Sequence, residues 1–135
     1  MPDRALVIVP TYNERENILK LIDAVLAQSP TIDVLVVDDG SPDGTGAIVD
    51  ERAALDSRVH IIHREKKLGL GTAYLAGFRW GLERDYAFIF EMDADFSHDP
   101  QHIPQFLESI ESADLVIGSR YRDRRVTVVN WPIAM

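Results

Sequence analysis

Hydrophobic and polar positions follow two alternating patterns along this chain. Short apolar runs rich in β-branched residues predict buried strands over residues 5–9, 32–37, 59–62, 86–92 and 115–117. Apolar residues at helical spacing predict helices over 18–26, 45–55 and 70–84, and Asp99-Pro100 predicts the start of a fourth. Strands that alternate with helices of this length form βαβ units, so we expect an α/β fold with a mostly parallel sheet.

Individual residues refine three of these elements. Pro10 is expected to end the first strand, and Thr45 is the expected N-cap of the helix over 45–55. In the helix over 70–84, Ala73, Gly77 and Gly81 share one face. Small residues on one face predict close packing of this helix on the sheet, although each glycine weakens the helix by roughly 1 kcal/mol.

The segment after Tyr121 differs from the rest of the chain. Residues 122–125 are charged, and residues 126–135 are mostly apolar with no companion element in the pattern. We therefore expect a chain that is interrupted before its fold is complete.

Composition narrows the class of protein. The 135 residues are 46% hydrophobic, which is enough for one packed domain. The net charge of −8 argues against binding of nucleic acid, which needs a basic face. Cysteine is absent, no apolar run approaches the ~20 residues that span a bilayer, and no signal-peptide pattern is present. We expect a soluble, cytoplasmic domain.

Polar loops follow three of the predicted strands, where open α/β sheets bind their ligands. In the first loop, Thr11 and Glu14 have the spacing of a capping box, which predicts that Glu14 folds back on the following helix. In the second loop, Asp38 and Asp39 place two carboxylates side by side. A ligand that donates hydrogen bonds, such as a ribose or a base edge, would relieve their repulsion, and a simple tight turn is the alternative.

The third loop, Glu91-Met92-Asp93-Ala94-Asp95, carries the most specific chemistry. At the end of an extended strand, residues i and i+2 point the same way, so Asp93 and Asp95 can face one hard cation. Mg²⁺ and Mn²⁺ prefer such oxygen ligands and keep open positions for phosphate oxygens. The alternative is a surface turn without a metal. Arg120, which follows the predicted strand over 115–117, suits bidentate recognition of phosphate.

Together these loops resemble family 2 glycosyltransferases with the GT-A fold, and among them the polyprenyl (dolichyl) phosphate mannose synthases. The matching stretches occur in order over residues 10–14, 37–45, 64–74, 92–95 and 118–121. The resemblance implies a GT-A (Rossmann-like) three-layer sandwich that is truncated at its C-terminus. It also implies a nucleotide-sugar-binding domain over 1–121 and an incomplete acceptor-side segment over 122–135.

The resemblance further implies inverting transfer of mannose from GDP-mannose to a polyprenyl monophosphate, with Mg²⁺ or Mn²⁺ as the cofactor. It implies action at the cytoplasmic face of a membrane, in contact with the membrane or with a membrane-anchored partner. Asp93, Asp95 and Arg120 would form the catalytic set, with Arg120 on phosphate. Asp95 would be the principal metal ligand, with Asp93 beside it and Ser97 as a weaker ligand. The donor would be held by Pro10, Tyr12, Glu14, Val37, Asp39, Asp93, Ala94, Asp95 and Arg120.

Physical chemistry is consistent with this reaction and leaves alternatives open. A phosphate monoester has a second pKa near ~6, so the acceptor is already largely a dianion at neutral pH and we assign no catalytic base. One alternative is transfer of glucose or another sugar by a family 2 enzyme. Another is a truncated, inactive nucleotide-binding fragment that acts through a partner. A sugar-phosphate nucleotidyltransferase is disfavoured because the first loop is not a Gly-rich triphosphate loop.

Overall fold

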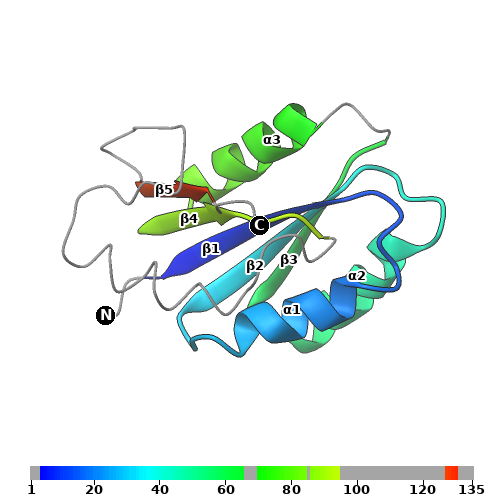
Figure 1. Ribbon diagram of the computed structural model, residues 1–135, viewed down its shortest axis with the longest axis horizontal. Helices are drawn as coiled ribbons and strands as arrows, with labels where there is room; N and C mark the ends of the chain where they lie inside the picture. Colours follow the sequence, from blue (N-terminus) through cyan, green and yellow to red (C-terminus); the bar gives the residue numbers. More distant parts are fainter. Residues whose placement is uncertain (1–3, 66–69, 85, 95–126, 131–135) are drawn as a thin grey trace, which may run out of the picture.

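The computed structural model describes residues 4–65, 70–84, 86–94 and 127–130 (Figure 1). Its strands form one parallel sheet with the order β3-β2-β1-β4-β5. Helices α1 and α2 cover one face of this sheet and α3 covers the other, which gives three layers (Figure 1). The predicted α/β fold with a parallel sheet is therefore confirmed. The bounds are β1 (Ala5–Thr11), α1 (Ile18–Leu26), β2 (Ile32–Asp38), α2 (Thr45–Leu55), β3 (Val59–His63), α3 (Leu70–Leu82), β4 (Phe88–Glu91) and β5 (Thr127–Asn130).

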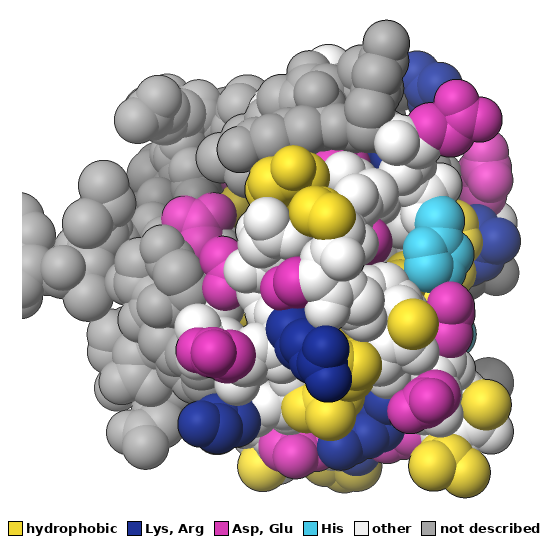
Figure 2. Space-filling view, turned by 90° about the vertical axis from the view of Figure 1, so that its right-hand side faces the viewer, with side chains coloured by type: hydrophobic (Ala, Val, Ile, Leu, Met, Phe, Trp, Pro, Cys, Tyr) yellow, Lys and Arg dark blue, Asp and Glu magenta, His cyan; other side chains and the backbone are white. Residues whose placement is uncertain are grey.

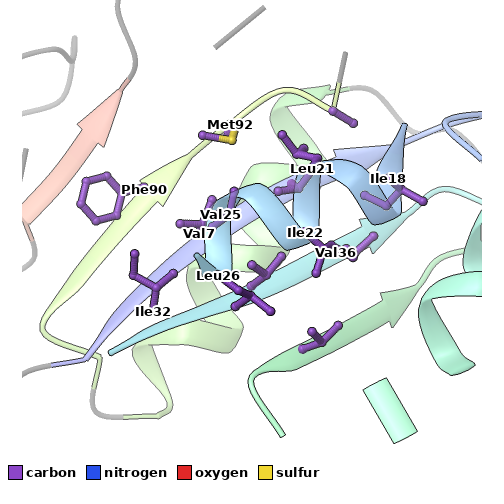
Figure 3. Close-up of a cluster of buried hydrophobic side chains, with 14 of the residues drawn as sticks. Val7, Ile18, Leu21, Ile22, Val25, Leu26, Ile32, Val36, Phe90 and Met92 are labelled. Carbon is purple, nitrogen blue, oxygen red and sulfur yellow. The ribbon is translucent and has the colours of Figure 1, made fainter. Parts of the chain in front are cut away.

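Two hydrophobic clusters hold the layers together. The larger cluster lies between the sheet and α1, where Val7, Val36 and Phe90 meet the helix (Figure 3). The smaller cluster lies beneath α3 and contains Leu6, Ile8 and other strand residues whose side chains point to the opposite face of the sheet. The predicted apolar stripe of α1 is wholly buried: Ile18, Leu21, Ile22, Val25 and Leu26.

The small face of α3 packs directly on the sheet, as predicted. A Cβ atom added to Gly77 would lie 2.6 Å from Ile8 Cγ2, and one added to Gly81 would lie 2.9 Å from Leu6 Cδ2. Real Cβ atoms do not approach other atoms so closely, so glycine sets the distance between this helix and β1. The loss of helix propensity at these positions is offset by close contact with the strand.

The prediction that Pro10 ends the first strand is wrong. Strand β1 continues through Pro10 to Thr11, in register with Val37 and Asp38 of β2. Pairing with β4 stops at Ile8 opposite Glu91, and the Ile8 carbonyl accepts from the N–H of Met92. Pro10 lies two residues after Ile8, so its backbone nitrogen points to the same side as that of Ile8, toward β4. The β4 pairing has already ended at this position, so the missing N–H of Pro10 breaks no hydrogen bond of the sheet.

Two further expectations differ from the structure. Residues 127–130 do have a companion element, because β5 pairs in parallel with β4. The N-cap of α2 is Gly44, with φ of 89°, and Thr45 is the first helical residue. The predicted fourth helix and the strand over 115–117 lie outside the described residues, and the division of the chain at residue 121 stays a prediction.

At the amino edge of the sheet, a buried carboxylate joins several elements. Asp33 accepts a hydrogen bond of 2.6 Å from the Tyr86 hydroxyl, lies 3.1 Å from His60 Nε2 and forms an ion pair with Arg4. Burial, followed by the hydrogen bond and the charge of Asp33, raises the pKa of Tyr86 above its usual range. This cluster fixes the end of the sheet opposite the polar loops.

Among the described residues, no helix is both long enough and apolar enough to cross a bilayer.

Candidate functional site

The carboxyl ends of the strands meet at one edge of the sheet. Because β1 lies between β2 and β4, the loop after β1 has the loops after β2 and β4 on its two sides. Thr11, Asp38 and His63 end three neighbouring strands in register. Figure 2 looks at the molecule from this side, and acidic side chains recur across it among basic ones. The polar loops that the sequence singles out are therefore neighbours in space.

Asp38 organises the start of the second loop. Its carboxylate accepts hydrogen bonds from the Thr11 hydroxyl at 2.7 Å and from the Ser41 hydroxyl and N–H at 2.5 and 3.1 Å. Thr11 and Asp38 are only 3% and 2% exposed, so these bonds satisfy a carboxylate that water cannot reach. Asp38 thus has a structural role in tying β1 to the turn after β2.

Asp39 is neutralised by Arg64, which follows β3. Arg64 Nε donates to Asp39 Oδ1 at 2.5 Å, and Nη2 donates to Oδ2 at 2.8 Å. The hydrogen bond to Asp39, opposed by burial and reinforced by the Asp39 charge, raises the pKa of Arg64. The chain itself therefore relieves the repulsion between Asp38 and Asp39 for which we had expected a ligand. Contact of Asp39 with a nucleoside stays a prediction.

The capping box predicted for the first loop does not form. Thr11 ends β1 and donates to Asp38, and α1 begins only at Ile18 with no side-chain cap. The Glu14 N–H donates instead to the Thr45 hydroxyl at 3.0 Å. A hydrogen bond to a distant residue at the start of α2 thus takes the place of the local capping bond that the sequence predicts. The spacing of residues along the sequence cannot distinguish these two arrangements.

The first and second loops are joined by further polar contacts. Asn13, with φ of 57°, donates from its N–H to the Ser41 hydroxyl at 2.9 Å. Asp43 accepts from the Arg15 N–H at 3.1 Å, and hydrogen bonds from Thr45 and Arg15 outweigh burial and lower the pKa of its carboxyl. A depression of about 240 Å³ opens at this junction, lined by Asn13, Glu14, Arg15, Glu16, Asn17 and Asp43.

The remaining predicted donor-binding residues are spread over this edge. Tyr12 follows β1 and is 39% exposed, whereas Val37 is fully buried. Pro10 is half-buried within β1. Val37 is therefore closed to a nucleoside in this conformation, whereas Tyr12 offers an accessible side chain.

The loop after β4 concentrates negative charge. Glu91 is 5% exposed, and burial together with the charge of Asp93 raises its pKa to about 7. Asp93 is half-buried, and its Oδ1 accepts a hydrogen bond of 2.9 Å from the Tyr74 hydroxyl of α3. Ala94 is 4% exposed. Asp95, Ser97 and Arg120 lie outside the described residues, so their expected roles stay predictions.

These features fit a divalent cation at the end of β4. The described residues contain no cluster of three His, Cys, Asp or Glu side chains that could hold a metal by themselves. Asp93 nevertheless supplies a hard carboxylate beside Glu91, whose ionisation is disfavoured by burial and, to a smaller extent, by repulsion from Asp93. A cation would reduce that repulsion.

Sequence reasoning missed the two side chains that hold the key carboxylates, Arg64 and Tyr74. Arg64 follows β3 and Asp39 follows β2. Knowledge that β2 and β3 are neighbours in the sheet would have placed the two residues together. Tyr74 lies near the N-terminal end of a helix whose small face packs on the sheet, so its hydroxyl reaches the carboxyl edge. Both signals depend on the order of the strands.

The parallel sheet and the polar loops at its carboxyl edge define an α/β protein, and comparison gives its family. The model of glycosyl transferase family 2 matches residues 6–134, so the chain belongs to that family. It is 56% identical over 131 residues to a polyprenol monophosphomannose synthase of Mycolicibacterium smegmatis, covering 96% of this chain and 49% of the relative. It is also 56% identical over 129 residues to an undecaprenyl-phosphate mannosyltransferase of Micrococcus luteus, covering 96% of this chain and 53% of that protein.

A solved structure supports the fold. A mannosyltransferase of Pyrobaculum calidifontis, solved in complex with GDP-Man and Mn²⁺, matches with a TM-score of 0.60 and 28% identity. The match covers 70% of this chain and 30% of that one. The structural neighbours have the GT-A fold, as expected from the sequence. The chain spans about half the length of the curated relatives that it matches.

Proposed function

We propose that this chain is the donor-binding part of a glycosyltransferase that moves mannose from GDP-mannose to a polyprenyl monophosphate with inversion. The observation that carries the proposal is the placement of Asp39 and Asp93 on the two sides of the β1 loop at one sheet edge. The names of the relatives and the GDP-Man and Mn²⁺ in the Pyrobaculum structure support it.

Each loop has a distinct task in this proposal. Pro10, Tyr12, Glu14 and Asp39 hold the guanosine. Asp93 and Asp95 hold a divalent cation together with the diphosphate, and Arg120 binds phosphate. Mg²⁺ or Mn²⁺ bound there would act as a Lewis acid that stabilises the charge of the departing nucleoside diphosphate.

The chain's own residues contribute mainly by positioning. The acceptor phosphate is already an anion at neutral pH, so no side chain has to remove a proton from it. Catalysis then depends on holding donor and acceptor in line and on neutralising charge. Arg120, as a bidentate donor, suits the second of these tasks.

Calorimetric titration with GDP-mannose, GDP and UDP-glucose, each with Mn²⁺ and with EDTA, tests the proposal. We expect GDP-mannose and GDP to bind with Mn²⁺ and to lose at least about tenfold in affinity with EDTA, because carboxylates alone repel a diphosphate. UDP-glucose should bind more weakly. Preference for UDP-glucose, or equal affinity without metal, would contradict the proposal.

The variant Asp95→Ala should abolish the Mn²⁺-dependent part of GDP affinity without unfolding the chain. Asp23→Ala is the matched control, because Asp23 is a 63%-exposed carboxylate on α1 and its loss changes the net charge equally. Transfer of labelled mannose to a short polyprenyl phosphate would then test turnover.

A further inference from the structure

One hydrogen bond links α3 to the acidic loop after β4. The Tyr74 hydroxyl donates to Asp93 Oδ1 at 2.9 Å, across a separation of 19 residues in the sequence. The Tyr74 ring packs against the cluster of Leu6, Ile8 and Val37 beneath α3, so its hydroxyl is held by the core. Because the Tyr74 ring is anchored, its hydroxyl is suited to hold the Asp93 carboxylate in one orientation.

Helix α3 is itself anchored on both sides of Tyr74. One turn along the helix, Gly77 lies so close to Ile8 that an added Cβ atom would be 2.6 Å from Ile8 Cγ2. Two residues before Tyr74, the Thr72 hydroxyl accepts a hydrogen bond of 3.1 Å from Arg64 Nη1. Arg64 in turn holds Asp39. The first turns of α3 thus connect the loop that contains Asp39 to the loop that contains Asp93.

We infer that Tyr74 is a positioning residue for metal-dependent donor binding, holding the Asp93 carboxylate in the orientation in which it meets the cation. The inference rests on the proposed function. A carboxylate held by a neighbouring hydroxyl loses its torsional freedom before the cation arrives, so less entropy is lost on binding. Outer partners of metal ligands affect metal affinity by about ten- to a hundredfold.

Tyr74→Phe tests the inference, because it removes the hydroxyl and keeps the ring in the core. GDP binding would be measured by calorimetry at a series of Mn²⁺ concentrations and in EDTA. We expect GDP affinity at limiting Mn²⁺ to fall about tenfold, affinity in EDTA to stay unchanged, and high Mn²⁺ to restore binding. An equal loss with Mn²⁺ and with EDTA, or no loss, would overturn the inference.

Tyr86→Phe is the matched control. It removes a tyrosine hydroxyl that donates to a carboxylate, Asp33, at the opposite edge of the sheet. We expect it to lower the unfolding temperature without changing the Mn²⁺ dependence of GDP affinity. If Tyr86→Phe weakens GDP binding in the same Mn²⁺-dependent way, lost stability explains the effect and the inference fails.

A double-mutant cycle with Asp93→Asn separates this inference from the proposed function. If Tyr74 acts through Asp93, Tyr74→Phe in the Asp93→Asn background should cause no further loss of Mn²⁺-dependent GDP affinity. Additive losses would overturn the role of Tyr74 and leave the proposed function intact. A wild-type chain whose GDP affinity does not depend on Mn²⁺ would overturn both.

Discussion

At the scale of single residues, this edge depends on how each carboxylate is neutralised. Asp39 has a bidentate guanidinium partner, and the two side chains are 8% and 13% exposed. A nearly buried pair of this kind is costly to break, because removal of one partner leaves the other charge without compensation. The exposed pair of Asp23 and Arg52 lacks this property, since water readily solvates Asp23 once Arg52 is gone.

Arg64→Met is therefore expected to lower the free energy of unfolding by about 3 kcal/mol, measured by urea denaturation. The control Arg52→Met should lower it by less than about 1 kcal/mol. Adding Asp39→Asn to Arg64→Met should recover part of the loss, because the uncompensated charge is then removed. Equal losses in the two single variants would show that the Asp39 pair is solvated like a surface pair.

At the scale of elements, α3 determines how the helical layer meets the sheet. Its two buried glycines allow β1 side chains to approach the helix backbone, whereas Gly71 at its start has no atom within 4 Å of an added Cβ. Substitution by alanine should therefore have opposite effects on stability at these two positions of one helix. Packing decides the result at Gly77, and backbone entropy decides it at Gly71.

Gly77→Ala is expected to destabilise the chain by about 2 kcal/mol, because the added methyl group overlaps Ile8. Gly71→Ala should instead stabilise it by about 0.5–1 kcal/mol, since alanine restricts the unfolded chain. Thermal and urea unfolding would measure both. Ile8→Ala combined with Gly77→Ala should cost less than the sum of the two single changes, and strict additivity would contradict the overlap.

At the scale of the whole molecule, the two edges of the sheet have separate tasks. Asp33 and its partners tie the starts of the strands together at the amino edge, while the carboxyl edge carries the donor-binding residues of the proposal. The length of β2 keeps the two edges apart, because Asp33 lies near its start and Asp39 directly follows its end. Stability and donor binding should therefore respond to different substitutions.

Asp33→Asn is expected to lower the free energy of unfolding by about 2 kcal/mol, because the amide nitrogen that replaces one carboxylate oxygen cannot accept a hydrogen bond from Arg4 or Tyr86. GDP affinity with Mn²⁺ should stay within about twofold of wild type, which calorimetry below the unfolding temperature would check. A large loss of affinity at preserved folding would show that the two edges are coupled.

The chain's local pattern determined the order and type of most elements. The spacing of apolar residues predicted α1, α2 and the strands over 32–38 and 59–63 to within a residue, because helices and buried strands impose fixed periods on the side chains that they bury. It also predicted that the loops of Asp39 and Asp93 lie at the same edge of the sheet, because the carboxyl ends of parallel strands lie at one edge. The spacing failed at Pro10 and at residues 127–130, where pairing with β2 and with β4, respectively, decides the structure.

Only the tertiary structure decided which groups neutralise the carboxylates. Arg64 meets Asp39 across 25 residues and Tyr74 meets Asp93 across 19, and neither separation is a period of helix or strand. Such contacts follow from strand order and from the distance between α3 and the sheet, which many residues set jointly. Sequence therefore determined the acidic residues and the edge they occupy, and packing determined the partners that orient them.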